Sequence, residues 1–332
     1  METDVTKQPD GPEIIILRTT GGLGNQLFQI ARAIELAEKH DAKLYLRRDQ
    51  HDKELGFWGN AAFSFLNGYK RRQRALAIEQ LMFCDYERLV ASLPKIFDTW
   101  WIRSAHVAFD YLWALSGLLG NQRRMGALLY SFFGGFGFQF CKELAFHPSP
   151  TVKGKFIEVY GYFQSEKYFA SAIRVVRRQL QAKEAMSPEE AAVYEKISTS
   201  QAAVAVSLRV GDDYRASPRH NVCDENYFRK AVDLVKKRHK NPTFFVFSDD
   251  PERAQSEMDF LNGSIIVKGF AEVKSLRLMS LCHHFIISNS SFSWWGAYLS
   301  ENSKKMVIAP DRWVNSNDLT DDIYFENMER IS

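Results

Sequence analysis

The sequence contains little cysteine. Only four of its 332 residues are Cys, namely Cys84, Cys141, Cys223 and Cys282. Their separations do not match the short Cys and His spacings of structural zinc sites. Sparse cysteines without a pattern are typical of proteins that keep free thiols in a reducing compartment. The sequence therefore argues against a small disulfide-linked secreted domain and against a zinc-binding domain.

The sequence also lacks a large net charge and a long apolar segment. Lys and Arg total 43 against 40 Asp and Glu, a net charge of +3, so there is no general attraction to nucleic acid. Residues 1–13 are polar and do not resemble a secretory signal. Arg123 and Arg124 divide the apolar stretch 106–140 into pieces too short to span a bilayer. We therefore expect a cytoplasmic protein.

Two basic clusters nevertheless stand out, YKRRQR at 69–74 and NQRR at 121–124. Beside the aromatic stretch 106–140 they could attract an anionic lipid surface, which predicts peripheral contact with the inner membrane. The alternative is an ordinary solvated charged surface.

Aromatic residues, by contrast, are abundant at 14% of the chain. They fill protein cores, but flat rings also pack against sugar rings. Residues 50–150 hold many aromatics without a clear repeat, so we expect short helices and loops there. Such an irregular region is a suitable place for acceptor recognition.

The first structured segment predicts a strand, a glycine turn and a helix. Residues 13–20, EIIILRTT, are typical of a buried parallel strand, and the 3.6-residue apolar spacing after GGLGNQ indicates a helix. Gly22 and Gly24 match a dinucleotide fingerprint, but Leu27 replaces its third glycine, so an NAD-dependent oxidoreductase stays only a minor alternative. The more general interpretation is a turn that brings a ligand close to the backbone, with Asn25 and Gln26 beside it.

The second half alternates strands and helices. Strands are expected at 202–210, 243–248, 264–269, 285–288 and 304–310. This alternation is typical of a parallel sheet covered by helices on both faces. We therefore predict an α/β protein of two domains, with the boundary between them near residues 150–200.

Capping residues also predict the starts of two helices before residue 202, where the alternation of strands and helices begins. Ser165 is a plausible N-cap for an amphipathic helix that continues to about residue 180. SPEE at 187–190 has the Ser, Pro and Glu of a capping box.

Three strands of the second half end in polar clusters, at 207–213, 248–250 and 289–291. Carboxyl ends of parallel strands share one edge of a sheet, where ligands bind. Arg209 offers a planar donor for a phosphate, and Ser290 stands at a helix start that attracts oxyanions. Asp249 suits the donors of a ribose or a guanine. Simple N-capping is the alternative role of Ser290, and the acidic pair 249–250 is weak evidence for a metal.

Four segments in order resemble the bacterial α-1,2-fucosyltransferases: GGLGNQLFQIA, GYFQSEKYF, FVFSDD and LMSLCHHFIISNSSFSWWGAYL. The resemblance implies a GT-B architecture of two Rossmann-like domains facing across a cleft, an acceptor-side domain at residues 13–160 and a domain that binds the GDP-sugar at residues 161–332. It implies inverting transfer of L-fucose from GDP-β-L-fucose, without a metal or other cofactor. The implied acceptor is the 2-hydroxyl of a galactose in a cell-surface oligosaccharide or glycolipid.

The resemblance also assigns residues in the second half. The family motif His-x-Arg-Arg-Gly-Asp aligns with SLRVGD, so Arg209 would hold the diphosphate and Asp212 would match the final acid. Ser207 and Val210 replace the histidine and the second arginine. The missing charge implies slow turnover, another donor sugar, or replacement by a neighbour such as Arg215 or Arg219.

The remaining assignments complete the predicted site. The resemblance places the phosphates at the NSSF run and the nucleoside at Asp249. Near the transferred sugar it places the glycine turn, with Asn25 as a catalytic residue. The donor-binding set is Gly22, Gly24, Gln26, Asp212, Asp249, Asn289, Ser290, Ser291 and Phe292.

Three matters stay open at this point. The general base could be Glu166, Asp212 or Asp213. The donor could be another GDP-linked deoxyhexose such as colitose. The chain could also be a non-catalytic homologue that only binds a nucleotide or a glycan.

Overall fold

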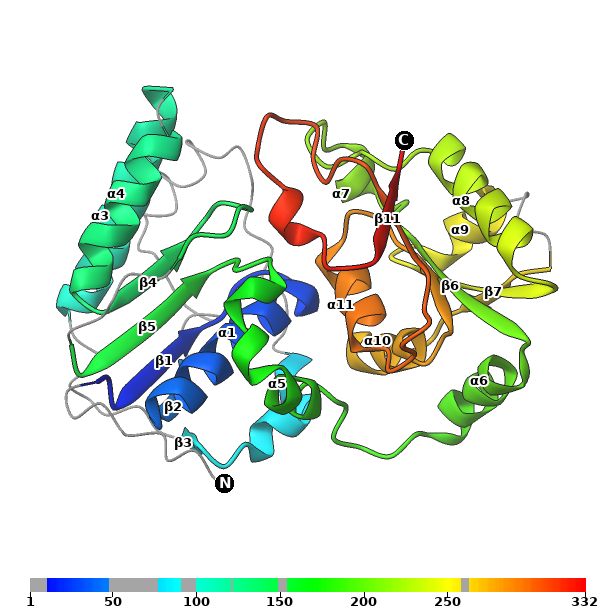
Figure 1. The fold of residues 1–332 in the computed structure, drawn as a ribbon, viewed down its shortest axis with the longest axis horizontal. Coiled ribbons are helices and arrows are strands. Elements are labelled where there is room, and N and C mark those ends of the chain that lie inside the picture. The colour runs from blue at the N-terminus through cyan, green and yellow to red at the C-terminus, as the bar shows by residue number, and fades with distance from the viewer. Residues whose placement is uncertain (1–10, 48–76, 91–99, 121, 149–153, 258–262) are drawn as a thin grey trace. The chain divides into compact units, whose positions relative to one another are not determined.

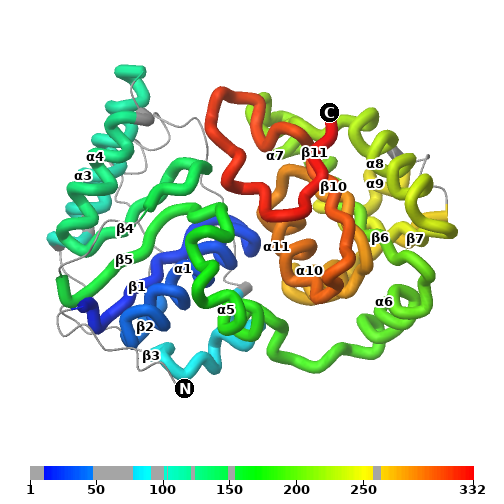
Figure 2. Tube along the Cα trace, viewed as in Figure 1, coloured from blue at the N-terminus to red at the C-terminus, as the bar shows by residue number. Residues whose placement is uncertain are grey.

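The computed structural model describes residues 11–47, 77–90, 100–120, 122–148, 154–257 and 263–332 (Figures 1 and 2). The basic cluster at 69–74 lies outside these residues. The chain divides into two compact units. Unit 1 comprises Met1–Leu76 and Phe83–Gln179, and unit 2 comprises Ala77–Met82 and Leu180–Ser332.

Unit 1 is built on a parallel sheet with the strand order β3-β2-β1-β5-β4. The expected first strand is present as β1, whose three central residues are fully buried. Its neighbours β2 and β5 both run parallel to it. The strand bounds are Ile14–Arg18 (β1), Lys43–Arg47 (β2), Leu89–Val90 (β3), Phe138–Cys141 (β4) and Phe156–Gly161 (β5).

Helices cover both faces of this sheet. Figure 1 shows α1 (Leu23–His40) and α5 (Ile173–Gln179) on one face and α3 (Trp100–Leu118) with α4 (Gln122–Gly135) on the other. The expectation of only short helices between 50 and 150 is wrong for α3 and α4. Their apolar periodicity is hidden because both helices carry apolar side chains on the exposed face as well as on the buried one.

The segment after β5 differs from the single helix expected from Ser165. Short 3₁₀ helices at Glu166–Tyr168 and Ala170–Ala172 precede α5. Ser165 does cap the first of them, because its hydroxyl accepts the Lys167 N–H. The interruption lies at Phe169, whose backbone leaves the helical region while its ring is fully buried near Phe28. Tertiary packing therefore overrides the local helical pattern.

Unit 2 contains a second parallel sheet, with the strand order β11-β10-β9-β6-β7-β8. The chain starts in the middle at β6, proceeds to one edge, crosses over and returns through β9 to the other edge. This is the doubly wound Rossmann order, and its switch point lies between β6 and β9. The strand bounds are Ala202–Leu208 (β6), Pro242–Ser248 (β7), Ile265–Val267 (β8), His284–Ile286 (β9), Val307–Pro310 (β10) and Met328–Ile331 (β11).

The helices of unit 2 also lie on both faces. Figure 1 shows α8 on one side of the sheet and α10 with α11 on the other. Aliphatic residues of β6, β7, β9 and β10 form a core cluster with α8. The helix bounds are Pro188–Thr199 (α6), Asp212–Arg215 (α7), Glu225–Arg238 (α8), Pro251–Glu257 (α9), Glu272–Ser280 (α10) and Ser291–Leu299 (α11).

The predicted capping box at the start of α6 is confirmed. Ser187 accepts the Glu190 N–H, and Glu190 accepts the Ser187 N–H. Glu190 is fully buried, and its carboxylate also pairs with Arg277 of α10. The capping residue therefore joins α6 to the helix layer of unit 2.

Helices α10 and α11 approach each other closely. A Cβ atom on Gly296 of α11 would lie 2.5 Å from the Met279 sulfur of α10. The adjacent Trp294 and Trp295 are fully buried, and the Trp294 indole donates to the Ile323 carbonyl at 2.6 Å. Both tryptophans are thus packing residues of unit 2.

The α/β fold class with two parallel sheets is confirmed. Within the described residues, no helix combines the length and the apolar character that crossing a bilayer requires.

Candidate functional site

The switch point of unit 2 places two polar strand ends side by side. Ser207 of β6 and Ser288, directly after β9, have their hydroxyl oxygens 3.3 Å apart. Beyond them the chain diverges, because β6 leads to α7 and α8 while β9 leads to α11 on the other face. This divergence opens a crevice at the carboxyl edge, which is where open α/β sheets bind ligands.

Arg209 is the cation at this crevice. Its guanidinium lies over the Tyr214 ring, 4.9 Å from the centroid. Its Nε is 3.5 Å from Asp249 Oδ2 and its Nη2 is 3.7 Å from Asp213 Oδ2. The side chain is still 27% exposed. Arg209 is therefore oriented by its neighbours and remains accessible to an anionic ligand.

Asp249 holds the loop that carries Arg209. Its Oδ1 accepts the N–H groups of Val210, at 2.9 Å, and Gly211, at 3.1 Å. Its other oxygen faces Arg209. In this structure the carboxylate thus orders the Arg209 loop, while its predicted contact with a nucleoside stays a prediction.

Tyr214 connects this loop to the end of β9, and the sequence reasoning missed it. Its hydroxyl donates to Asn289 Oδ1 at 2.9 Å and accepts the N–H groups of Val222 and Cys223. Burial raises the pKa of the Tyr214 hydroxyl, so it stays protonated. The only local signal was an aromatic residue directly after the GDD sequence.

Asn289 is buried, and both ends of its side-chain amide are hydrogen-bonded. Its Nδ2 donates to the carbonyls of His220, at 2.9 Å, and Trp313, at 2.8 Å. Because its Oδ1 is already engaged by Tyr214, the amide serves to join loops around the crevice. Its predicted role in donor binding stays a prediction.

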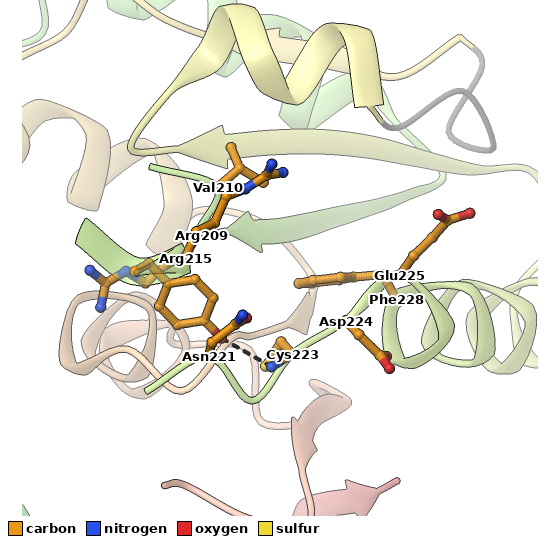
Figure 3. A pocket seen from close by; sticks show the side chains of 9 residues that line it. Arg209, Val210, Arg215, Asn221, Cys223, Asp224, Glu225 and Phe228 are labelled. Atoms are coloured by element: carbon orange, nitrogen blue, oxygen red, sulfur yellow. Dashed lines mark hydrogen bonds between the residues drawn. The ribbon is translucent and has the colours of Figure 1, made fainter. Parts of the chain in front are cut away.

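A cavity of about 540 Å³ opens next to Arg209 (Figure 3). The Phe228 ring points into it, whereas the Arg215 guanidinium points away. Burial raises the pKa of the Cys223 thiol to about 12, so this group stays protonated and is a poor nucleophile at neutral pH. The lining residues are Arg209, Val210, Tyr214, Arg215, Asn221, Cys223, Asp224, Glu225 and Phe228.

The start of α11 follows directly after Asn289. Ser290 is the N-cap residue, but its side chain makes no capping bond. The hydroxyls of Ser290 and Ser291 have no hydrogen bond to the described residues, and both residues are partly exposed, as is Phe292. The free hydroxyls and the first-turn N–H groups of a helix can bind an oxyanion.

The position of the second family arginine is occupied by a buried Val210, whose side chain joins the α8 core cluster. A different cationic side chain contacts the backbone of Val210. Arg253 of α9 donates to the Val210 carbonyl at 2.9 Å and to Asp212 Oδ1 at 2.7 Å. The Arg253 bond lowers the pKa of Asp212. Of the expected replacements, Arg219 pairs instead with Asp318.

The predicted residues of unit 1 lie in the glycine turn after β1. Gly21, at φ +81°, makes the turn, and Gly22 is the N-cap residue of α1. Gln26 is fully buried and donates to the Gly21 carbonyl at 2.9 Å. Asn25 is partly exposed and accepts a bond from Gln164 at 2.7 Å.

Gly24, within the first turn of α1, is buried. Asn25 is therefore the member of this group that offers a polar side chain to a ligand. In the described residues, no group of three or more His, Cys, Asp or Glu side chains could hold a metal ion.

Several known proteins resemble the chain, over most of its length or over part of it. The α-1,2-colitosyltransferase of Escherichia coli is 26% identical, covering 92% of this chain and 94% of its own. The human galactoside α-(1,2)-fucosyltransferase 1 is 25% identical, covering 45% of this chain and 44% of its own. The solved structure of fucosyltransferase NodZ from Bradyrhizobium is 13% identical, covers 87% of this chain and 93% of its own, and has a TM-score of 0.47.

The sequence model of one family, described as glycosyl transferase family 11, matches residues 149–331. This match includes β6, the Arg209 loop, β9 and α11. Because it spans more than half of the 332 residues, the protein belongs to glycosyl transferase family 11.

Proposed function

We propose that the protein transfers L-fucose from GDP-β-L-fucose to the 2-hydroxyl of a galactose-containing acceptor, with inversion at the anomeric carbon. The acceptor hydroxyl attacks that carbon while GDP leaves from the opposite side. Negative charge then grows on the β-phosphate, so a positive group fixed beside it stabilises the transition state.

The oriented Arg209 at the β6–β9 switch point carries this proposal. Asp249 and Tyr214 hold the guanidinium at the crevice, and the start of α11 follows the neighbouring strand. A guanidinium can bind a phosphate through two parallel hydrogen bonds. We assign the diphosphate to Arg209, Ser290 and Ser291, and expect no metal to be required.

The roles of the other residues follow from this placement. Asp212 and Asp213 are the candidate general bases of unit 2. The hydrogen bond from Arg253 lowers the pKa of Asp212, so this carboxylate is ionised at neutral pH. Asn25 and the glycine turn would contact the transferred sugar.

Colitose is the second candidate for the transferred sugar. The similarity to an α-1,2-colitosyltransferase favours it, as do Ser207 and Val210 at positions where the fucosyltransferase motif has histidine and arginine. Both candidates use a GDP-linked deoxyhexose, so the same phosphate site serves each of them.

Mass spectrometry of reaction products tests the proposal. The purified protein is incubated with GDP-fucose or GDP-colitose and an array of galactose-ended oligosaccharides, with and without EDTA. We expect a fucosylated product whose 2-linkage is shown by methylation analysis and whose yield EDTA does not change. A product from GDP-colitose alone would identify colitose as the donor sugar. GDP binding without any product would identify a non-catalytic homologue.

We also propose that unit 1 contacts an anionic membrane surface from the cytoplasm. The α3–α4 hairpin exposes large apolar side chains along its length, and the most exposed are Leu118 at 76% and Leu119 at 71%. Exposed Arg124 follows them after the turn, which adds attraction to anionic lipid. We define the hairpin surface as Val107, Tyr111, Leu115, Leu118, Leu119, Leu128, Phe132 and Phe136.

A further inference from the structure

A second group of charged side chains lies at the carboxyl edge of the unit 1 sheet. β1 ends at Arg18 and β2 ends at Arg47, and these residues are register partners on neighbouring parallel strands. Glu158 of β5 is the register partner of Ile16, two positions before Arg18. Side chains at these positions share one face of the sheet, and α3 covers that face through His106.

Glu158 is already neutralised by its neighbours. It is fully buried, and its Oε1 lies 2.9 Å from His106 Nε2 and 3.6 Å from Arg47 Nη1. A buried carboxylate needs such partners because an isolated buried charge is strongly destabilising. These three side chains therefore form a compact structural group.

Arg18 interacts with Glu158 only through its charge, with no hydrogen bond or ion pair between the two side chains. Its guanidinium lies over the Tyr160 ring, 5.1 Å from the centroid. Its Nε and Nη1 are buried without a hydrogen-bond partner, and it forms no ion pair with the described carboxylates. Arg18 as a whole is nevertheless partly exposed. A cation fixed in this way at a sheet edge retains donors for a ligand.

The second carboxylate oxygen of Glu158 indicates a further chemical property of that ligand. Glu158 Oε2 is also buried without a hydrogen-bond partner. An oxyanion would satisfy the donors of Arg18, and a neighbouring hydroxyl group could donate to the carboxylate. An acidic sugar carries both of these groups on one ring.

We propose that Arg18 binds the oxyanion of an acidic sugar, either a carboxylate or a phosphate, in unit 1. The assignment of this sugar to the acceptor rests on the proposed function, whereas the binding of the oxyanion does not. The Tyr160 ring fixes the guanidinium plane, and Glu158 selects a hydroxyl next to the anionic group. Unit 1 then distinguishes acidic from neutral sugars through Arg18.

Ligand-observed NMR titration of the full chain tests this proposal. The probes are methyl β-D-galacturonide, galactose 1-phosphate and neutral methyl β-D-galactoside, with GDP at saturating concentration to occupy the crevice of unit 2. We expect an acidic probe to bind at least about tenfold more tightly than the neutral one, as charge-assisted hydrogen bonds imply. The tighter acidic probe identifies the oxyanion as a carboxylate or a phosphate.

Arginine variants locate the binding. Arg18→Gln should remove the preference for acidic probes, whereas Arg88→Gln, at a partly exposed arginine of unit 1 that pairs with Glu38 and Asp41, should keep it. Equal binding of acidic and neutral probes to the unaltered protein would overturn the proposal. So would a preference that survives Arg18→Gln and disappears in Arg209→Ala.

A second variant keeps the test valid if Arg18→Gln does not fold. Arg18→Met keeps an apolar side chain against Tyr160 and should fold even where Arg18→Gln does not, with the same loss of preference. GDP affinity is measured for each protein and should stay unchanged, since Arg209 belongs to unit 2. If GDP does not bind at all, the proposed donor fails, while the comparison of sugar probes still decides the role of Arg18.

Discussion

At the scale of single residues, the proposed catalysis depends on how Arg209 is held. Asp249 orders its loop through two backbone N–H groups, and Tyr214 supports its guanidinium from one side. The arginine therefore needs little rearrangement before it binds a phosphate. Loss of a fixed donor at a developing oxyanion typically costs 10²- to 10³-fold in rate.

Arg209→Ala should lower kcat/KM by about 100-fold or more, because the charge that stabilises the leaving phosphate is lost. Arg209→Lys keeps the charge but not the planar pair of donors, so we expect a smaller decrease of about tenfold. Steady-state kinetics with the donor varied measures both effects. Near-normal activity of the alanine variant would contradict the assignment of the diphosphate.

Arg238→Ala is the matched control for this series. Arg238 is also an ion-paired arginine of unit 2, bonded to Glu329, but it lies in the last turn of α8 and not at the crevice. An exposed ion pair contributes only about 0–1 kcal/mol to stability. The control variant should therefore remain folded and keep its activity.

The residues of the crevice differed in how well the sequence predicted them. Arg209 and Ser290 were identified because polar residues directly after apolar strands mark the carboxyl edge of a parallel sheet. Tyr214 and Arg253 were missed because their roles depend on contacts with distant segments, such as Asn289 for Tyr214. Hydrogen bonds across the fold leave no periodic signal in the sequence.

At the scale of elements, the amino ends of three neighbouring strands depend on histidine ring nitrogens that accept backbone hydrogen bonds. His284 Nδ1 accepts the Met306 N–H before β10, and His283 Nδ1 accepts the Ala203 N–H of β6, both at 3.1 Å. The His284 ring lies 3.9 Å from the ring of His239. Burial, together with the nearby histidines, lowers the pKa of His284 to about 4.

The stability of the protein should therefore fall as the pH decreases from about 6.5 to about 4. In this range the unfolded chain binds a proton at His284 before the folded protein does, so protonation favours unfolding. Above about pH 6.5 the contribution of His284 to the free energy of unfolding is constant. Urea unfolding at a series of pH values should show the free energy of unfolding decreasing through this window.

His284→Asn should make that decrease shallower, because Asn can accept the Met306 N–H and does not titrate in this range. The unfolding free energies at pH 7 serve as the internal reference for the two proteins. Curves that remain parallel from pH 7 to pH 4 would exclude His284 as the titrating group.

Elements with a clear local sequence pattern were predicted well, and those whose pattern is masked or weak were not. β1 and the capping box of α6 appear as expected, since their patterns are local. α3 was not predicted, because apolar residues on its exposed face mask the helical period. β11 was also not predicted, as its sequence MERI is short and only partly buried.

At the scale of the whole molecule, the hairpin surface predicts reversible binding to vesicles. The protein should co-sediment with vesicles that contain anionic phosphatidylglycerol at low salt, and binding should weaken as salt increases. Leu118→Ser combined with Leu119→Ser should reduce this binding by at least about tenfold, because two exposed apolar anchors are lost.

Leu319→Ser is the control, since Leu319 is an exposed leucine of unit 2. It should bind vesicles like the unaltered protein. An absence of vesicle binding at low salt would contradict the proposal, and a concentration-dependent dimer at the same surface would identify a second copy as its occupant.

The close contact at Gly296 has a consequence for the speed of substrate capture. Gly296 in the middle of α11 lies against the Met279 side chain, with no room for a methyl group unless that side chain shifts, so α11 packs closely on α10. The amide groups after Ser290 belong to this packed helix, so a diphosphate bound as proposed would meet an electrostatic field that is already in place. A side chain at position 296 would have to displace the Met279 side chain, and we expect it to slow the docking of the nucleotide by disturbing α11.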